Sequence, residues 1–426
     1  MAEWRRGRRW IEWGKDVLIV LLLCSAVYLA GRTPVYSRIR NWIATQPQPV
    51  QSTVHLRRDE IQPCLICVRG PLGLFGVGYD ADQTRRVFEE FSPLLGEALS
   101  TAGEAQTVGS VRWRSLLEMP GACFFFQGEP PFSVLSALLN DGEGQAPSGG
   151  ASQMLLAWDG ETLWLGWREG AEWYRAPTQL SYEGSLEDLL ADYNPNGAAY
   201  AYALAKEDRA YSALDPYAPV LLSTPSPQVY TAYSPDLVRD REALEELLDA
   251  LSFRSGVGSA YETSGELALN EGGDRLRLGS DGSVFFRAGE ETRYPVAGPL
   301  TAAQAALRSW ELLDLAYAPW KGEDTQFSLA QVQETEGGWR VCFQTSLAGV
   351  PLRAGEWTAV FTVTERGVTE FSLRLTQLTA AGAYTLLPSP RLAAAAVRSL
   401  AGDGQLTLGY TVSGGIAQAA WLTGSP

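Results

Sequence analysis

The feature that most constrains this chain is a single apolar segment near the N-terminus, residues 17–31, that follows a cluster of cations. A bilayer core requires about 20 apolar residues, and flanking aromatic and long basic side chains extend the segment to that length. Positive charge beside a first apolar segment stays in the cytoplasm. We therefore expect one membrane anchor with a cytoplasmic N-terminus and an extracytoplasmic remainder. The topology-setting cations are Arg5, Arg6, Arg8, Arg9 and Lys15.

A cleavable signal peptide is the alternative to an anchor. Cleavage requires small residues at an A-x-A-like site. The triplets Cys24-Ser25-Ala26 and Tyr28-Leu29-Ala30 match that pattern poorly. The sequence therefore favours an uncleaved signal-anchor in residues 1–32.

Charge is distributed unevenly between the two predicted sides of the membrane. The first 32 residues hold six Lys/Arg and three Asp/Glu, whereas residues 33–426 hold 28 and 46 and so carry a net charge of -18. Nucleic-acid binding requires a basic face, so the balance argues against it. It also argues against binding anionic lipids or wall polymers through charge alone, and it suits a soluble exported region.

Composition divides the exported part into blocks. Residues 33–55 form a Pro-containing linker. We expect an N-terminal α+β domain at 56–233, a middle helix-plus-strands domain at 234–297 and a C-terminal helix-plus-meander domain at 298–426, since nearly 400 residues exceed one core. The proline-rich stretch 215–235 reads as the connector between the first two.

The hydrophobic periodicity predicts an α+β fold of antiparallel sheets with packed helices. Helices are expected at residues 83–102, 132–139, 185–193, 235–251, 301–316 and 389–400. Pro93 predicts a kink or break in the first of these. Strands are expected at residues 61–68, 108–117, 122–127, 154–158, 162–167, 172–176, 199–204, 265–270, 275–278, 284–287, 327–334, 339–346, 356–364, 368–375 and 407–412.

Catalytic signatures are missing from the sequence. The single histidine, His55, falls in the linker, which cannot hold a base in register. HExxH, GxSxG and Walker A motifs do not occur, and the glycine-rich residues 73–78 lack a following lysine. We therefore expect no enzymatic activity and no cofactor.

The CxxC motif, Cys64 and Cys67, lies in an apolar, β-branched run that predicts a buried strand. Redox CxxC motifs stand at the N-terminus of a helix, and no helix is expected to follow here. A zinc site would need a second pair of ligands, so we expect neither redox nor metal function.

Two other patterns leave function open. Trp158, Trp164, Trp167 and Trp173 line a sugar-binding face in one interpretation and pack a sheet in the other, which period-2 spacing favours. The acids Glu183, Asp188 and Asp192 leave an unrecognised hydrolase as a rival that sequence alone does not exclude.

Three segments carry a resemblance to a known family. The middle block contains LRLGSDGSVFFRA, the last block SLAGVPLRAGEWTAVFTVTERGVTEFSLRL, and YTLLPSPRLAAAAV then begins a Pro-initiated helix. With the single anchor, these segments resemble the YycH/YycI family of extracytoplasmic regulators of the WalK (YycG) sensor histidine kinase in Gram-positive bacteria. The Gly-Val-Pro turn is similar to those of PepSY-like modules.

The resemblance implies a non-enzymatic, cell-membrane regulator of a two-component system for cell-wall homeostasis. It also implies two partners: a WalK-type kinase and a YycH-like or YycI-like paralogue. Helices packing in lipid favour small residues at the seam, so we expect kinase contact through residues 17–31. Ser25, Ala26 and Ala30 form the small face, and Leu18, Leu22 and Leu29 a bulkier one. The alternative is an exported module that binds cell wall or a peptide.

Overall fold

The computed structural model describes residues 61–140, 146–180, 185–253, 259–263, 265–296, 298–353, 357–399, 404 and 406–423. All of them belong to one compact unit, Val54–Pro426. The expected anchor and linker lie outside the described residues. Within the described ranges no helix combines the length and apolarity needed to cross a bilayer.

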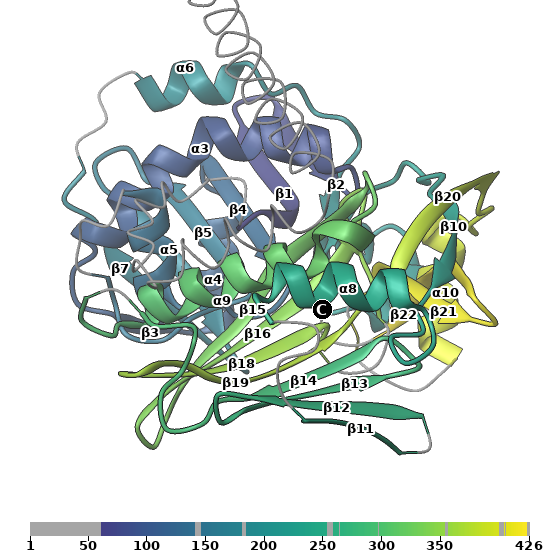
Figure 1. Cartoon of the computed structure of the whole chain (residues 1–426). Helices are drawn as coiled ribbons and strands as arrows, with labels where there is room; N and C mark the ends of the chain where they lie inside the picture. Colours follow the sequence, from purple (N-terminus) through teal and green to yellow (C-terminus); the bar gives the residue numbers. More distant parts are fainter. Residues whose placement is uncertain are drawn as a thin grey trace, which may run out of the picture. The chain divides into compact units, whose positions relative to one another are not determined.

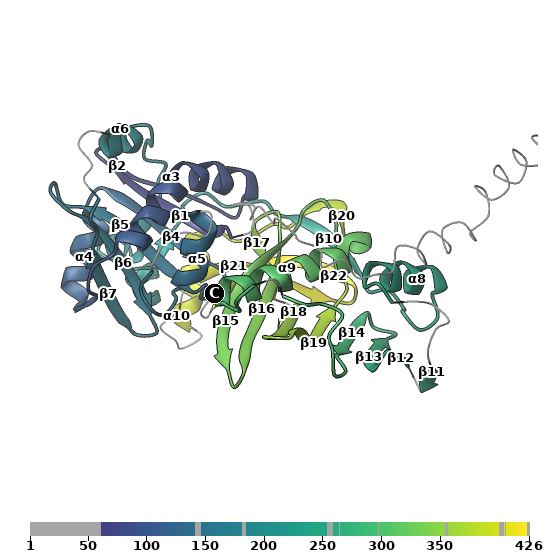
Figure 2. The same cartoon turned by 60° about the vertical axis from the view of Figure 1, so that its left-hand side comes forward.

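The first block is built on a seven-stranded antiparallel sheet with the order β2-β1-β4-β5-β6-β7-β3 (Figures 1 and 2). Its β5–β6 hairpin turns at Asp159, whose Oδ1 accepts from Thr162 N–H at 2.8 Å, and Gly160 takes φ +100°. This confirms the hairpin predicted from Asp-Gly. The strands are β1 (Pro63–Gly70), β2 (Gly73–Gly78), β3 (Gln106–Val108), β4 (Gly121–Phe126), β5 (Gln153–Trp158), β6 (Leu163–Glu169) and β7 (Glu172–Pro177).

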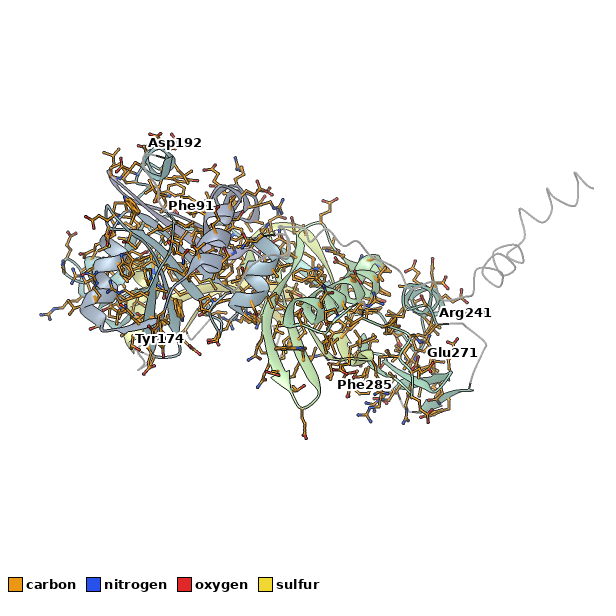
Figure 3. All side chains as sticks on the ribbon, turned by 90° about the vertical axis from the view of Figure 1, so that its left-hand side faces the viewer. Phe91, Tyr174, Asp192, Arg241, Glu271 and Phe285 are labelled. Carbon is orange, nitrogen blue, oxygen red and sulfur yellow. The ribbon has the colours of Figure 1, made fainter. Side chains whose placement is uncertain are left out.

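Helices cover both faces of this sheet. One face packs against α3 (Ala81–Thr101) and α5 (Phe132–Leu139), and the other against α4 (Ser110–Glu118). Asp80 caps α3 by accepting from Gln83 N–H at 3.0 Å. The helix continues through Pro93, so it has no break there, and the alternative of a kink stays a prediction. Burial of the apolar face around Phe91, labelled in Figure 3, stabilises the helix despite the missing N–H.

The expected strand at residues 108–117 is also wrong, because only its first residue is in a strand and most of it is α4. Trp113, Leu116 and Leu117 are spaced as one helical face, and all three are buried against the sheet. The expected strand at 199–204 is similarly divided between β8 (Ala199–Tyr200) and α7 (Ala201–Leu204). This region also contains α6 (Ser185–Ala191), the 3-10 helix η2 (Arg209–Ala213) and β9 (Pro219–Val220).

A second sheet runs in the order β11-β12-β13-β14-β19-β18-β16-β15, with β17 paired to β16. Helices α8 (Arg241–Ala250) and α9 (Ala302–Tyr317) lie on one face of it (Figure 1). Helix α8 begins at 241 and not at 235, because the Asp240 carboxylate caps it by accepting from Glu242 and Ala243 N–H. The strands are β11 (Ser259–Thr263), β12 (Glu266–Glu271), β13 (Asp274–Gly279), β14 (Ser283–Arg287), β15 (Thr325–Thr335), β16 (Gly338–Leu347), β17 (Val350–Pro351), β18 (Ala359–Thr364) and β19 (Gly367–Arg374), and η3 (Ala318–Trp320) follows α9.

This sheet joins the predicted middle and C-terminal blocks. Strand β14 pairs antiparallel with β19, and Phe286 lies directly opposite Phe371 with their ring centroids 4.9 Å apart. Both rings belong to the core that α8 and α9 cover. The division at residues 297/298 therefore falls within one hydrogen-bonded sheet, and independent folding of the three blocks stays a prediction.

A third, four-stranded sheet has the order β20-β10-β22-β21. Its strand β10 (Gln228–Tyr233) comes from the stretch predicted as a connector and pairs with β20 (Gln377–Tyr384) and β22 (Ile416–Thr423). These partners follow β10 by about 150 residues or more, so local pattern could not reveal the pairing. The predicted closing strand is confirmed as β21 (Leu406–Ser413), and the last helix as α10 (Pro390–Ser399).

The expected α+β architecture of antiparallel sheets is confirmed, since every pair of strands named above is antiparallel. The predicted strands do not include β2, β9, β10, β11, β17, β20 or β22. The glycine-rich residues 73–78 are a strand, β2, paired with β1, and not a turn.

Candidate functional site

The CxxC cysteines lie in β1, as the apolar run predicts. Cys67 is 1% exposed and lies opposite Cys123 of β4, and Cys64 occupies an irregularity in the same strand pair. The four described cysteines are free thiols. Burial raises the pKa of Cys64 to about 11 and that of Cys123 to about 12. Neutral thiols are poor nucleophiles and poor metal ligands.

Acidic residues form no metal-binding group in the described part of the chain. Asp188 on α6 and Asp192 just beyond that helix are both exposed, and Figure 3 shows Asp192 at the surface. Glu183 lies outside the described residues. The two described carboxylates are therefore solvated surface groups.

The four tryptophans of the first sheet do not share one face. Trp158 and Trp167 pack on the core under α3 and α5, whereas Trp164 and Trp173 pack on the α4 side. Trp164 is covered by the Arg175 guanidinium, whose carbon lies 3.9 Å from the ring centroid. The aromatic spacing therefore produces sheet packing on both sides and no continuous sugar-binding platform.

The residues expected to act in the membrane all lie outside the described part of the chain. They are the seam residues Leu18, Leu22, Ser25, Ala26, Leu29 and Ala30 and the cations Arg5, Arg6, Arg8, Arg9 and Lys15. Their roles stay predictions.

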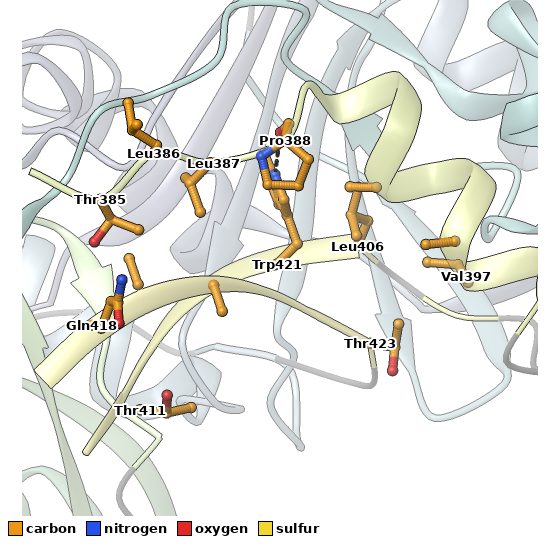
Figure 4. A pocket seen from close by; sticks show the side chains of 14 residues that line it. Thr385, Leu386, Leu387, Pro388, Val397, Leu406, Thr411, Gln418, Trp421 and Thr423 are labelled. Atoms are coloured by element: carbon orange, nitrogen blue, oxygen red, sulfur yellow. Dashed lines mark hydrogen bonds between the residues drawn. The ribbon is translucent and has the colours of Figure 1, made fainter. Parts of the chain in front are cut away.

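A groove of about 470 Å³ lies in the C-terminal part (Figure 4). We call it the C-terminal groove. Its walls come from residues 385–388, from α10 and from strands β21 and β22. Most of the lining is apolar, including Leu387, Val397, Leu406 and Trp421. The polar atoms are chiefly hydroxyls and one amide, so the groove suits an uncharged, apolar occupant.

Trp421 holds one wall of the groove in place. Its Nε1–H donates to the Pro388 carbonyl at 2.9 Å, and its ring meets Tyr79 edge-on at 6.3 Å between centroids. The Tyr79 hydroxyl accepts from Leu408 N–H at 3.2 Å. Burial raises the pKa of Tyr79 well above its usual range, so this hydroxyl stays neutral. The groove is therefore tied directly to the first block.

Helix α10 forms the opposite wall and is attached separately. Ala394 and Val397 pack into a cluster with Tyr211 of η2, and the Arg391 guanidinium pairs with Asp208. Backbone donation from Ala210 and the Arg391 pair lower the pKa of Asp208. Both walls thus rest on elements of the first block.

The surface around the groove is depleted of charge. Residues 377–426 contain only Arg391, Arg398 and Asp403 as charged residues, although 19% of the whole chain is charged. Leu386, which lines the groove, is 95% exposed. Low charge with exposed large apolar side chains is typical of the centre of a protein interface. Other exposed apolar side chains of the same sheet and of α10 are Tyr233, Tyr384, Leu392, Val412 and Ile416.

Sequence reasoning missed this surface. The low charge of the last 50 residues is a signal that was available. The groove itself needs β22, which was not expected, and the attachment of α10 to η2, which no local pattern encodes.

Comparisons with known proteins support the fold. No family model matches the chain, and no curated protein matches it. The crystal structure of YycH from Bacillus subtilis superposes with a TM-score of 0.51 at 10% sequence identity, covering 86% of this chain and 94% of that chain. The YycH-like fold expected from the resemblance is confirmed by this match.

Proposed function

We propose that this chain is a membrane-anchored extracytoplasmic regulator of a sensor histidine kinase of the WalK type. The observation that carries the proposal is the YycH-like fold over 86% of the chain. The proposed kinase partner is implied by the sequence resemblance, and the proposed location at the cell membrane follows from the predicted N-terminal anchor. The regulator acts by contact and not by catalysis.

The C-terminal groove and the low charge of its surroundings support contact on the exported side. A regulator without chemistry must bind the two signalling states of its partner with different affinity. An apolar groove walled by fixed elements offers a rigid surface for that purpose. In the membrane, the predicted small-residue face of Ser25, Ala26 and Ala30 offers a second contact.

The first experiment is a membrane crosslinking pull-down with the tagged full-length chain and a form lacking residues 1–32. We expect the full-length chain to capture a sensor kinase and the truncated form to lose most of that capture. If neither form captures a kinase, the proposed function is wrong.

A second experiment tests the groove. Leu386→Asp places a charge in the groove, and Leu72→Asp is the matched control, since Leu72 is also exposed, at 71%, but lies at the β1–β2 turn. We expect Leu386→Asp to alter kinase output without changing protein level, and Leu72→Asp to leave output unchanged. Equal effects of the two substitutions on kinase output would show that the groove does not contribute to regulation.

The groove also favours a second function, an exported module that binds an uncharged peptide or wall fragment. Its volume of about 470 Å³ falls in the range of small-ligand sites. Retention of wall material by both forms of the chain, with no kinase captured, would establish this module instead of the regulator.

A further inference from the structure

A different surface concentrates positive charge in this acidic chain. On the second sheet, helices α8 and α9 cover one face, and Arg275, Arg277 and Arg287 point to the other. Successive side chains of a strand point to opposite faces of the sheet, and the strand neighbours of these arginines, Leu276, Leu278 and Phe286, are buried in the core under the helices. We call the residues Arg275, Arg277, Phe285 and Arg287 the arginine face. In Figure 3, Phe285 lies at the lower edge of the sheet, away from α8 at the labelled Arg241.

Strand register forces two of these arginines together. Arg275 of β13 lies directly opposite Arg287 of β14. Directly opposed residues on an antiparallel pair have Cβ atoms about 5 Å apart, and like charges there destabilise the sheet. Departures from such local rules concentrate at functional sites. The two guanidinium groups have partners on opposite sides of this strand pair, Tyr261 of β11 and Glu370 of β19, and a bound anion would offset the repulsion that is left.

The guanidinium groups are only partly neutralised by the protein. Arg287 contacts Glu370 at 3.4 Å, and that pair is exposed. Arg275 donates to the Tyr261 hydroxyl, and the Arg277 carbon lies 4.6 Å from the Phe285 ring centroid. Among the described residues, neither Arg275 nor Arg277 has a carboxylate within ion-pair distance. Positive charge therefore stays available to a ligand.

Phe285 orients these arginines and is not itself an open contact. Arg277 approaches its ring at 4.6 Å, and Arg287 approaches it at 5.9 Å. Cation–π contact holds guanidinium groups over an aromatic ring and leaves their N–H edges free to donate. The face therefore presents several fork-shaped donors side by side, at the spacing of neighbouring strands and of alternate residues.

The shape of this face selects among anionic partners. An acidic protein segment needs a pocket or an apolar anchor for tight binding. Here Ala268, opposite Arg277, is only 4% exposed, and guanidinium groups lie over the Phe285 ring, so neither side chain is an open apolar anchor. A flexible polymer with repeated phosphates needs only repeated donors, which arginine supplies in bidentate form.

We propose that the arginine face binds a phosphate-bearing polyanionic polymer. The site lies on strands β13 and β14 and does not involve the C-terminal groove. It does not depend on the proposed kinase partner. The net charge of -15 for the whole chain conceals this face, on which Glu370 of β19 is the carboxylate that pairs with Arg287.

The test measures binding of long-chain inorganic polyphosphate to the full-length protein in detergent, with poly-glutamate as the comparison polymer. The variant carries Arg275→Gln, Arg277→Gln and Arg287→Gln. Its matched control carries Arg85→Gln, Arg86→Gln and Arg241→Gln, which removes the same charge from α3 and α8. Thermal unfolding confirms that both variants are folded.

We expect wild-type protein to bind polyphosphate at low salt, with affinity falling steeply as salt rises. The arginine-face variant should lose about tenfold or more in affinity and show a shallower salt dependence, while the control stays within about twofold. Lack of binding by the wild type, or equal losses in the two variants, overturns the proposal. Equal binding of poly-glutamate overturns the phosphate assignment in favour of an acidic protein segment.

Discussion

Gly128 packs against the backbone of Ala330, a residue of the second sheet more than 200 positions later. Its φ is +99°, and a Cβ at this position would come within 2.4 Å of the Ala330 carbonyl oxygen. The same oxygen accepts from Glu129 N–H at 2.7 Å. This close backbone contact joins the first block to β15 and shows why only glycine fits there.

Gly128→Ala should therefore destabilise the protein by about 3 kcal/mol, combining the left-handed backbone cost with steric overlap. Gly160→Ala is the control, because Gly160 has φ +100° but a Cβ added there would meet nothing within 4 Å. It should cost only the backbone part, about 1–2 kcal/mol. Urea denaturation measures the free energy of unfolding of both variants. Equal losses of stability would show that the backbone around Ala330 can shift to accommodate the added methyl group.

Arg293 anchors the middle of the second sheet. Its Nε donates to Asp274 Oδ2 at 2.6 Å, and its guanidinium carbon lies 3.6 Å from the Phe253 ring centroid. Arg293→Ala leaves the buried Asp274 carboxylate without this partner and should cost about 3–5 kcal/mol. Arg241→Ala breaks an exposed pair with Glu245 and should cost less than about 1 kcal/mol. Equal shifts of the urea denaturation midpoint in Arg293→Ala and Arg241→Ala would contradict the stabilising role given to Arg293.

The buried thiols predict a loss of stability in alkali. Burial raises the pKa of Cys64 to about 11 and that of Cys123 to about 12. A thiol of the unfolded chain titrates near pH 8.5. The folded state therefore favours the protonated thiol. Its contribution to the free energy of unfolding is fully present below about pH 8.5, the pKa in the unfolded chain, and is lost as the pH rises through the higher pKa of the folded protein.

Each such thiol should lower the free energy of unfolding by up to about 1.4 kcal/mol per pH unit between the two pKa values. Urea denaturation across this range measures the slope, and Cys123→Ala should make it shallower. In the native state, alkylation at neutral pH should leave Cys67 and Cys123 unmodified. Rapid native labelling of either thiol would show that the β1–β4 region opens readily.

The predicted membrane seam has its own test. Ala26→Leu combined with Ala30→Leu makes the small face bulky and should relieve regulation of the kinase without changing protein level. Leu18→Ala with Leu22→Ala changes the bulkier face as a comparison. Kinase output measured with a reporter distinguishes them, and unaltered output in the Ala26/Ala30 variant would exclude the helix contact.

Local pattern predicted many elements where packing agrees with it. The helices around Phe91 and Trp310, and the hairpin at Asp159, follow from periodicity and turn chemistry alone. The prediction is wrong at residues 108–117, because their apolar residues are compatible with a strand as well as with a helix. Burial of Trp113, Leu116 and Leu117 against the sheet stabilises the helix. The prediction is wrong again at β10, whose partners are remote in sequence.

The candidate sites show the same division. The strand around Cys64 and Cys67 and the lack of a catalytic motif could be recognised from residue types. The C-terminal groove could not, because its walls combine α10, β21 and β22 with supports from the first block. Nor could the arginine face, because the opposition of Arg275 and Arg287 depends on strand register.

The sequence by itself determined the α+β class, the expectation of one N-terminal anchor and the absence of recognisable catalytic motifs, since these depend on composition and local spacing. Only the tertiary structure decided that one sheet spans two predicted blocks, that Trp164 and Trp167 face opposite ways, and where charge gathers or is missing. Long-range strand pairing sets those features, and its partners and register depend on packing across the whole core.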